Sequence, residues 1–572
     1  MSQKKKKLER KLEKIGTTSL PGVVHDIDNR KRFSIKKILN DNWKFLMILS
    51  LVIIGLFING MAGDFVSDDY ATIATNPDVL NLSSYKGIIS PVSMSNYFMA
   101  VFFGINKVVY HLYSLFTYIV FCWVALVFLN FVVDKNLSRL TMIIFAFLPI
   151  HVEAVTWISG KPYLFIALLL LLTFIFLIKY IEENKKIYLF ISLISLLLGF
   201  MTDRPRPFAI FLVVPLYLWY LGNKYYLDRF KKIMPYVVGI GLLVFLIVLP
   251  TALDRINLVN NTNNNTGSVF YNPFEQYPTG ITKYLQLIVF PVDLTLYHTM
   301  YVAPIWLNWI IFLSFLSLIF YFGRRDKRIT FGLLFFLVTL LPSMAPVKVS
   351  WLVAERYAFL PSLGFSIFMA VLIDRLWRVN KYVAGGILGI ILVLFSIRIV
   401  MRNDDWTTNH KLWVNTVWVS PNSHNAWNNI GDDYDKLGQM DNAIKGFTQS
   451  TVVKPDYADA FHNRANIFFK INRLDLARNS YETALSLNPN LIQTYMSLIQ
   501  IDFMEGKFDE AVAKSEYLLR ADPNNPQYLY ISGIAYMQKG NLVEAKIRLE
   551  KALRIAPDFG AAKEALVQVN AY

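Results

Sequence analysis

A fixed interval between prolines is the strongest constraint on the carboxyl-terminal part of this chain. Five prolines recur every 34 residues: Pro421, Pro455, Pro489, Pro523 and Pro557. A helix-turn-helix unit of this length cannot bury its apolar face alone, so successive copies stack into a solenoid with a concave groove. The interval therefore predicts four helical repeats over residues 424–559 and a capping helix over residues 560–572.

The first repeat places bulky and small residues in a defined order. Its pattern-defining residues are Trp427, Gly431, Tyr434, Ala443, Phe447 and Pro455. This order resembles the tetratricopeptide repeat family. Later copies keep the small residue of Ala443 at 34-residue steps: Ala477, Ala511 and Ala545. The third copy departs from the pattern, with Asp502 at the position of Tyr434. The resemblance implies a peptide-binding or scaffolding solenoid, and a solenoid that serves only packing or oligomerisation is the alternative.

The rest of the chain is too apolar for a soluble protein. Of 572 residues, 55% are hydrophobic and only 17% are charged, which indicates a membrane protein. Eleven apolar runs approach the length of a membrane span. They fall at about 43–61, 108–133, 138–157, 162–180, 187–201, 207–222, 234–251, 302–322, 329–347, 357–376 and 382–400. We therefore predict an all-α chain in which a membrane domain of about eleven spans, residues 43–401, precedes the solenoid.

The basic loops predict the orientation of this domain. The amino-terminal tail, residues 1–42, begins MSQKKKKLERKLEK, and the loops after most even-numbered runs are short and basic. Because Lys and Arg are enriched in cytoplasmic loops, the tail is expected inside. An odd number of spans then places the connector 402–423 and the repeats outside, together with a long first outer loop, residues 62–107.

Charge and cysteine content exclude two other classes of protein. The formal net charge is +16, but residues 420–572 hold 16 Lys and Arg against 18 Asp and Glu, so the excess lies in the membrane part. Nucleic acid is therefore not an expected partner. The single cysteine, Cys122, lies in an apolar run, which predicts neither a disulfide framework nor a thiolate metal site.

Charged residues cluster at the predicted outer ends of the spans, where burial beside a membrane is costly and points to function. The four groups are Asp68 with Asp69, His151 with Glu153 and Lys161, Asp203 with Arg204 and Arg206, and Glu355 with Arg356. Carboxylates beside cations suit a site that deprotonates a hydroxyl and stabilises an anionic leaving group such as phosphate. Each group also has a plainer interpretation. The aspartates suit a turn or helix cap, His151 an interface histidine, and Glu355 with Arg356 a local ion pair.

Several longer strings carry a second family resemblance. They are DFVSDDYATIATNP, PIHVEAVTWISGK, NPF followed by YLQLIVFPVDLTLYHT, LLPSMAPVKVSWLVAERYAFLPSLGF, and RNDDWTTNHKLW before the repeats. Together with the repeats, they resemble the transmembrane-and-tetratricopeptide protein O-mannosyltransferases, within the GT-C class of glycosyltransferases.

The resemblance implies an inverting glycosyltransferase of the EC 2.4 class that uses a polyprenyl-phosphate sugar, with mannose as the family's sugar, and a protein hydroxyl as acceptor. It implies Asp68 as general base with Asp69 as its partner, and Arg356 as a clamp on the donor phosphate. His151 and Glu153 would shape the donor or acceptor pocket, and the remaining pocket candidates are Glu355, Lys161 and Arg204. Two positions depart from the family: TDRPR stands where a Lys-Glu pair is expected, and Lys161 stands where arginine is usual.

These observations predict the bilayer, a lipid-linked sugar and a peptide acceptor as partners. They assign no metal-ligating residues and no certain cofactor, and they leave open whether a divalent metal ion assists. The richness in Lys, Asn and Ile favours a bacterial inner membrane over the endoplasmic reticulum. Two other hypotheses stay open. One is a non-catalytic membrane-anchored scaffold. The other is a ligase or polymerase of surface polysaccharide, which would also use a lipid-linked donor but a different acceptor.

Overall fold

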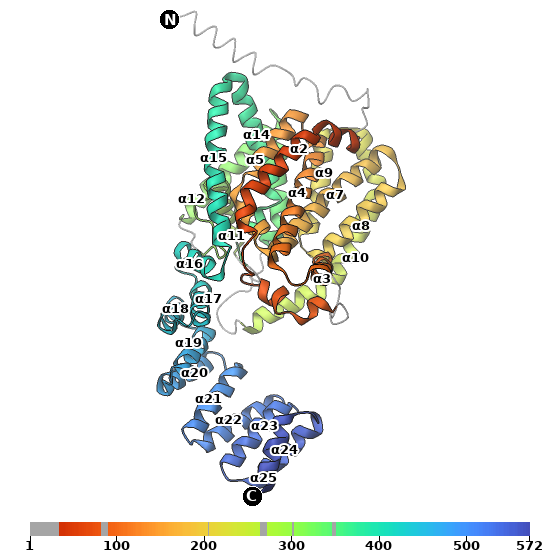
Figure 1. Cartoon of the computed structure of the whole chain (residues 1–572). Coiled ribbons are helices and arrows are strands. Elements are labelled where there is room, and N and C mark those ends of the chain that lie inside the picture. Colours follow the sequence, from red (N-terminus) through yellow and green to blue (C-terminus); the bar gives the residue numbers. More distant parts are fainter. Residues whose placement is uncertain are drawn as a thin grey trace, which may run out of the picture. The chain divides into compact units, whose positions relative to one another are not determined.

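The computed structural model describes residues 34–81, 90–203, 205–262, 272–299, 303–345 and 351–571, and all regular elements in these ranges are helices. The chain divides into two compact units, Met1–Leu412 and Trp413–Tyr572 (Figure 1). The helices of the first unit are α2 (Ile35–Phe57), α3 (Pro91–Phe103), α4 (Lys107–Val132), α5 (Lys135–Ala146), α6 (Val152–Thr156), α7 (Lys161–Glu183), α8 (Lys186–Thr202), α9 (Ile210–Leu221), α10 (Lys224–Thr262), α11 (Pro273–Val289), α12 (Ile305–Gly323), α13 (Lys327–Leu340), α14 (Pro361–Val379) and α15 (Lys381–Asp405). Helix α16 (Asn409–Val419) begins in the first unit and ends in the second.

Several of these helices are long and apolar enough to cross a membrane. In the described ranges six qualify: Ile35–Gly60, Lys107–Val132, Ile158–Glu183, Ile305–Gly323, Lys327–Met344 and Lys381–Asp405. A seventh span results if Lys135–Ala146 and Pro149–Thr156, which meet at a bend of 63°, cross together. Helices α8 and α9 are apolar but shorter. The chain is thus an integral membrane protein with several spans, and the predicted count of eleven remains a prediction.

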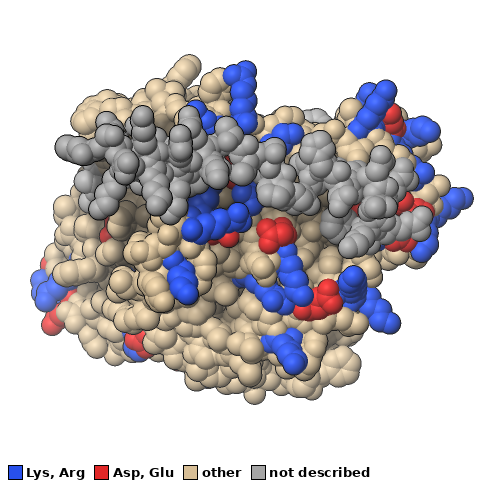
Figure 2. All heavy atoms as spheres, turned by 90° about the horizontal axis from the view of Figure 1, so that it is seen from above, with Lys and Arg blue, Asp and Glu red and all other residues tan. Residues whose placement is uncertain are grey.

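The basic loops between the helices gather at one end of the first unit. Arg139 Nε at the start of α5 donates to Asn42 Oδ1 near the start of α2, at 2.7 Å. Arg375 near the end of α14 pairs with Asp326, which precedes α13, at 2.8 Å. The turn between α14 and α15 lies at this end in Figure 1. Figure 2 views the molecule from there and shows Lys and Arg side chains, with some Asp and Glu, spread over this face.

The opposite end collects the loops that carry the candidate site. Asn59, just after α2, donates from Nδ2 to the carbonyl of Val400 in α15 at 2.9 Å. Arg206, at the start of the short 3₁₀ helix η7 (Arg206–Ala209), donates from Nε to Ser343 Oγ at 3.0 Å. Segments distant in sequence therefore meet at this end.

The second unit consists of paired helices at a constant interval. They are α17 (His424–Lys436), α18 (Met440–Val453), α19 (Ala458–Lys470), α20 (Leu474–Leu487), α21 (Ile492–Met504), α22 (Phe508–Ala521), α23 (Pro526–Gln538), α24 (Leu542–Ile555) and α25 (Gly560–Ala571). The alanine of each second helix is fully buried, from Ala443 to Ala545, which lets the two helices of a repeat approach closely. Asp502, the residue that departs from the pattern, is buried and paired with Arg478 at 2.8 Å and Lys514 at 2.6 Å.

Gly431 is required by packing in the first repeat. A Cβ at this position would lie 2.8 Å from the ring of Phe447, closer than real Cβ atoms come to neighbouring atoms. We expect Gly431→Ala to lower the free energy of unfolding by about 1–3 kcal/mol, the usual cost of overpacking. The control is Gly560→Ala, where a Cβ meets nothing within 4 Å. Thermal unfolding of the purified variants measures both, and equal stability of the two would contradict the packing argument.

Candidate functional site

The first outer loop holds its two aspartates in different environments. Asp69 is buried, and its Oδ2 accepts the Val66 N–H at 3.1 Å. Its Oδ1 accepts the Ser159 N–H at 2.7 Å and the Ser159 hydroxyl at 2.5 Å. Asp68 is exposed, and among the described residues its carboxylate has no hydrogen-bonding partner. Asp69 therefore fixes the loop to the segment before α7, while Asp68 keeps a free carboxylate.

The backbone beside these aspartates is strained. Ser67 has a φ of 53°, in the left-handed region that residues other than glycine seldom adopt. Its N–H donates to Asn409 Oδ1 at 2.8 Å, and the N–H of Asp64 donates to the carbonyl of Thr407 at 2.8 Å. Strain that is held by several hydrogen bonds is typical of functional loops.

Burial raises the pKa of Asp69 from its ordinary value of 3.8 to about 6, against the opposing effects of the Ser159 and Val66 hydrogen bonds and the Lys161 charge. The folded state thus holds this proton more tightly than the unfolded chain. The resulting stability, about 3 kcal/mol, is present below pH 3.8 and is lost as the pH rises through about 6.

We therefore expect the melting temperature of the wild type to fall relative to that of Asp69→Asn between about pH 4 and pH 7. Asparagine does not titrate, so the difference between the two melting curves isolates this one group. Parallel pH profiles of the two proteins would show that Asp69 ionises normally.

Lys161 lies near Asp69 and, like it, is fully buried. Its Nζ donates to Asn96 Oδ1 at 2.8 Å and lies 4.7 Å from the ring centre of Tyr110. The ammonium is thus satisfied by a neutral amide and an aromatic face. It contributes positive charge near Asp69 without being open to solvent.

The second group centres on Arg356. Its guanidinium pairs with Glu153, its backbone N–H donates to Glu153 Oε2 at 2.8 Å, and its Nε donates to the hydroxyl of Tyr163 at 3.2 Å. Arg206 forms a similar unit with Asp203. The two guanidinium groups share their aromatic neighbours: Tyr163 lies 5.6 Å from Arg356 and 4.6 Å from Arg206. Tyr357 lies 5.1 Å from Arg356 and 4.7 Å from Arg206. Two cations around one pair of tyrosines form the densest positive region among these groups.

Glu355 and its neighbour Arg356 have different partners. The local ion pair between these two residues, the plainer interpretation of the sequence, does not form. Its carboxylate receives two contacts from Arg402, at 3.0 and 3.4 Å, and lies 3.5 Å from His298 Nε2. Burial by itself would raise the pKa of Glu355, but the charge of Arg402 and the contact with His298 hold it below its ordinary value. Arg402 also contacts Asp405 at 3.2 Å.

His151 lies apart from these ion pairs. Its Nδ1 is 3.2 Å from the hydroxyl of Tyr118, and its Nε2 is 2.8 Å from Ser362 Oγ. The ring is fully buried, with the ring of Phe145 at 4.2 Å and that of Phe359 at 5.0 Å. These are the contacts of a core side chain. Arg204, the other pocket candidate, lies outside the described residues.

The segment around Trp157 and Ser159 connects the aspartate loop to the two buried ion pairs. Ser159 binds Asp69, and two residues earlier the ring of Trp157 lies 5.3 Å from the Arg356 guanidinium. The same ring stacks on Trp406 with centres 5.5 Å apart, and Arg402 lies 5.3 Å from Trp406. The aspartate loop, the Glu153–Arg356 pair and the Glu355–Arg402 pair therefore form one network of contacts.

Several members of this network were not candidates from the sequence. They are Asn96, Ser159, Tyr163, His298 and Arg402. Arg402 and His298 carry a recognisable signal, because each is a titratable residue at the end of an apolar run. The neutral residues carry none, because serine, asparagine and tyrosine are common at helix ends.

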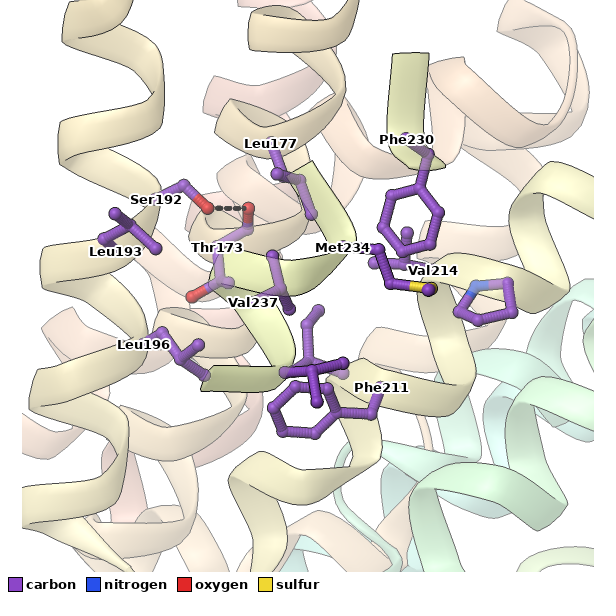
Figure 3. A pocket seen from close by; sticks show the side chains of 13 residues that line it. Thr173, Leu177, Ser192, Leu193, Leu196, Phe211, Val214, Phe230, Met234 and Val237 are labelled. Carbon is purple, nitrogen blue, oxygen red and sulfur yellow. Dashed lines mark hydrogen bonds between the residues drawn. The ribbon is translucent and has the colours of Figure 1, made fainter. Parts of the chain in front are cut away.

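The first unit also contains an apolar cavity of about 140 Å³ between α7, α8, α9 and α10 (Figure 3). Leu177, Phe211 and Met234 point into it, and its few polar groups are engaged, since Ser192 Oγ donates to the carbonyl of Thr173 at 2.9 Å. No charged residue lines it, so it suits hydrocarbon rather than a reacting group. In the described ranges, no group of three or more His, Cys, Asp or Glu residues is placed to hold a metal ion.

Fold and site together define an all-helical integral membrane protein with a network of ion pairs at one end of its helices and a helical solenoid after them. Tetratricopeptide repeat family models match residues 424–457, 458–491 and 502–569, which confirms the predicted repeats.

The chain has relatives of known name. Protein O-mannosyl-transferase TMTC3 of Homo sapiens is 23% identical over 482 residues, which cover 73% of this chain and 52% of the relative. A protein O-mannosyl-transferase of Caenorhabditis elegans is 24% identical over 439 residues, 70% of this chain and 61% of the relative. TMTC4 of Mus musculus is 31% identical over 147 residues, 25% of this chain and 20% of the relative. The chain is a distant homologue of the first two of these transferases over about 70% of its length, and it spans about half the length of the curated relatives it matches.

Solved structures of repeat proteins resemble part of the chain. The TPR protein YrrB, described as having an unusual peptide-binding site, is 20% identical with a TM-score of 0.25, covering 34% of this chain and 96% of YrrB. MamA is 22% identical with a TM-score of 0.24, covering 26% of this chain and 80% of MamA.

Proposed function

We propose that this chain is an inverting membrane glycosyltransferase that moves a sugar from a polyprenyl-phosphate donor to a hydroxyl of a protein acceptor. Transfer takes place at the end of the membrane domain that carries Asp68, on the non-cytoplasmic side, and the repeats recruit the acceptor. The observation that carries the proposal is the free carboxylate of Asp68 on a loop tied by Asp69 to the segment that also holds the Glu153–Arg356 pair.

The reaction follows from these groups. The acceptor hydroxyl gives its proton to the Asp68 carboxylate while its oxygen attacks the anomeric carbon from the face opposite the phosphate. The bond between that carbon and the phosphate oxygen breaks, and the lipid phosphate leaves with the electron pair. Because attack and departure occur on opposite faces, the anomeric configuration inverts.

Arg356 and Arg206 supply the positive charge for the leaving phosphate. Both guanidinium groups are largely buried, with 10% and 16% of their side chains exposed, and a charge-assisted contact is stronger in such surroundings than in water. Glu153 and Asp203 hold the two arginines in place before the donor binds. Asp69 acts through its neighbour as a positioning residue.

Orientation is part of the proposal. With eleven spans and a cytoplasmic amino terminus, the basic end of the bundle faces the cytoplasm, and Asp68 and the repeats face the other compartment. A topology reporter fused after Tyr572 should register outside the cytoplasm.

The direct test is sugar transfer by the purified full-length chain in lipid nanodiscs. The assay offers a polyprenyl-phosphate sugar with a Ser/Thr-containing peptide, and in parallel with a polysaccharide acceptor. Glycosylated peptide is the expected product. Transfer to the polysaccharide alone would favour the ligase hypothesis, and no transfer with intact donor binding would favour a scaffold.

A further inference from the structure

Asp68 stands between two residues that are held from different parts of the chain. On one side, the carboxylate of Asp69 accepts hydrogen bonds from Ser159, in the segment before α7. On the other side, the N–H of Ser67 donates to Asn409 Oδ1 at 2.8 Å. Asn409 is the first residue of α16, the helix that leads from the last candidate span into the repeats. The carboxylate of Asp68 is therefore free, while the residues before and after it are fixed.

We propose that Asn409 is a positioning residue for sugar transfer. Its side chain holds the first outer loop in the conformation that presents the Asp68 carboxylate to the acceptor hydroxyl. The inference rests on the proposed function, because it concerns the general base of that reaction. It also gives the helix that leads into the repeats a part in the chemistry.

The conformation of Ser67 is the first argument. Its φ of 53° lies in the left-handed region, which costs free energy for a residue with a side chain and persists only where surrounding contacts hold it. The hydrogen bond to Asn409 is one of these contacts. Because Asp68 is the next residue, a change of φ at Ser67 would swing the Asp68 carboxylate away from its position.

Close packing of the loop against the turn before α16 is the second argument. The N–H of Asp64 donates to the carbonyl of Thr407 at 2.8 Å. A Cβ on Gly63 would lie 3.2 Å from Thr407 Cα and 3.4 Å from the carbonyl oxygen of Trp406, whose side chain is fully buried. The turn is thus a firm support for the loop, and Asn409 extends this support to the residue next to the base.

An asparagine at the start of a helix has a plainer interpretation as a helix cap. The oxygen of Asn409 accepts from Ser67, which belongs to the loop and not to α16. The side-chain contact within the first turn of α16 comes from Thr408, whose Oγ1 accepts the Lys411 N–H at 3.3 Å. The capping role therefore falls to Thr408, and Asn409 serves the loop.

The test compares turnover of full-length variants in nanodiscs, with a polyprenyl-phosphate sugar and the Ser/Thr-containing peptide. Asn409→Leu keeps the size of the side chain but offers no acceptor. We expect its kcat to fall about 10–100-fold, because a displacement of about 1 Å at a reacting group has an effect of this order. The KM for the donor should stay unchanged, because Arg356 and Arg206 are not touched.

Two further variants identify the group that matters. Asn409→Asp keeps an acceptor oxygen and should recover most of the lost turnover. The matched control, Lys411→Ala, lies on the same helix and breaks only the exposed ion pair with Asp404, so it should turn over like the wild type. An equal loss in the Leu and Asp variants would mean that the acceptor oxygen does not hold the loop, and this would overturn the proposal.

Hydrogen exchange gives a readout that does not depend on activity. Peptides over residues 64–69 should exchange at least about tenfold faster in Asn409→Leu, because the Ser67 N–H loses its acceptor, and at the wild-type rate in Asn409→Asp. If the wild type transfers sugar and Asn409→Leu keeps its kcat, the positioning proposal fails alone. If the wild type transfers no sugar, the transferase proposal fails, and the exchange rates decide separately whether Asn409 holds the loop.

Discussion

Asp68→Asn is expected to lower the turnover number for sugar transfer by about 10²–10⁴-fold, the usual contribution of a general base. An amide cannot accept the hydroxyl proton, and the described surroundings of Asp68 offer no second free carboxylate, since Asp69 is buried and engaged with Ser159 and Val66. Donor affinity should stay unchanged, because Asp68 makes no contact with the arginines among the described residues. The loss should therefore appear in kcat rather than in KM for the donor.

The same substitution at Asp78 provides the control. Asp78 lies in the same loop, at the first turn of a short 3₁₀ helix over Pro77–Leu80, and it takes no part in the network. Asp78→Asn should transfer sugar at the wild-type rate. If Asp68→Asn keeps full turnover with a melting temperature like that of the wild type, the general base lies elsewhere.

The repeats could be predicted in detail because their contacts are local. Each unit packs on its sequence neighbour, so a single period and a few small residues such as Gly431 and Ala443 describe the domain. The sequence shows that Asp502 departs from the repeat pattern, but only the structure shows how the protein tolerates a carboxylate there. Its carboxylate is neutralised by Arg478 and Lys514, which come from the helices before and after its own.

The membrane site could be predicted only in outline. Loop charge places the candidate residues at one end, but it does not say which carboxylate pairs with which cation. Glu355 and Arg356 are adjacent and yet bind Arg402 and Glu153, because they lie in a 3₁₀ turn, Glu355–Ala358, where successive side chains diverge by about a third of a turn.

The burial of two candidate residues could not be predicted from the sequence either. His151 and Lys161 stand in polar-looking strings, but the rings that enclose them come from α4, from α5 and from residues after position 350. A histidine with both ring nitrogens occupied in an aromatic core and a histidine open to a ligand look the same in sequence. Only the packing distinguishes them.

Glu355→Leu is expected to lower the free energy of unfolding by about 3–5 kcal/mol, because it leaves the fully buried guanidinium of Arg402 without its main partner. The remaining contact with Asp405 compensates only in part, since that carboxylate is 22% exposed. Removing both charges, with Glu355→Leu and Arg402→Met, should recover most of the loss, because no buried charge is left unpaired.

Thermal and denaturant unfolding in detergent compare the three proteins. The exposed pair of Asp404 and Lys411, at 2.6 Å, is the control, and Asp404→Ala should cost no more than about 1 kcal/mol. A double variant as unstable as Glu355→Leu would mean that the carboxylate matters for its shape and not for its charge.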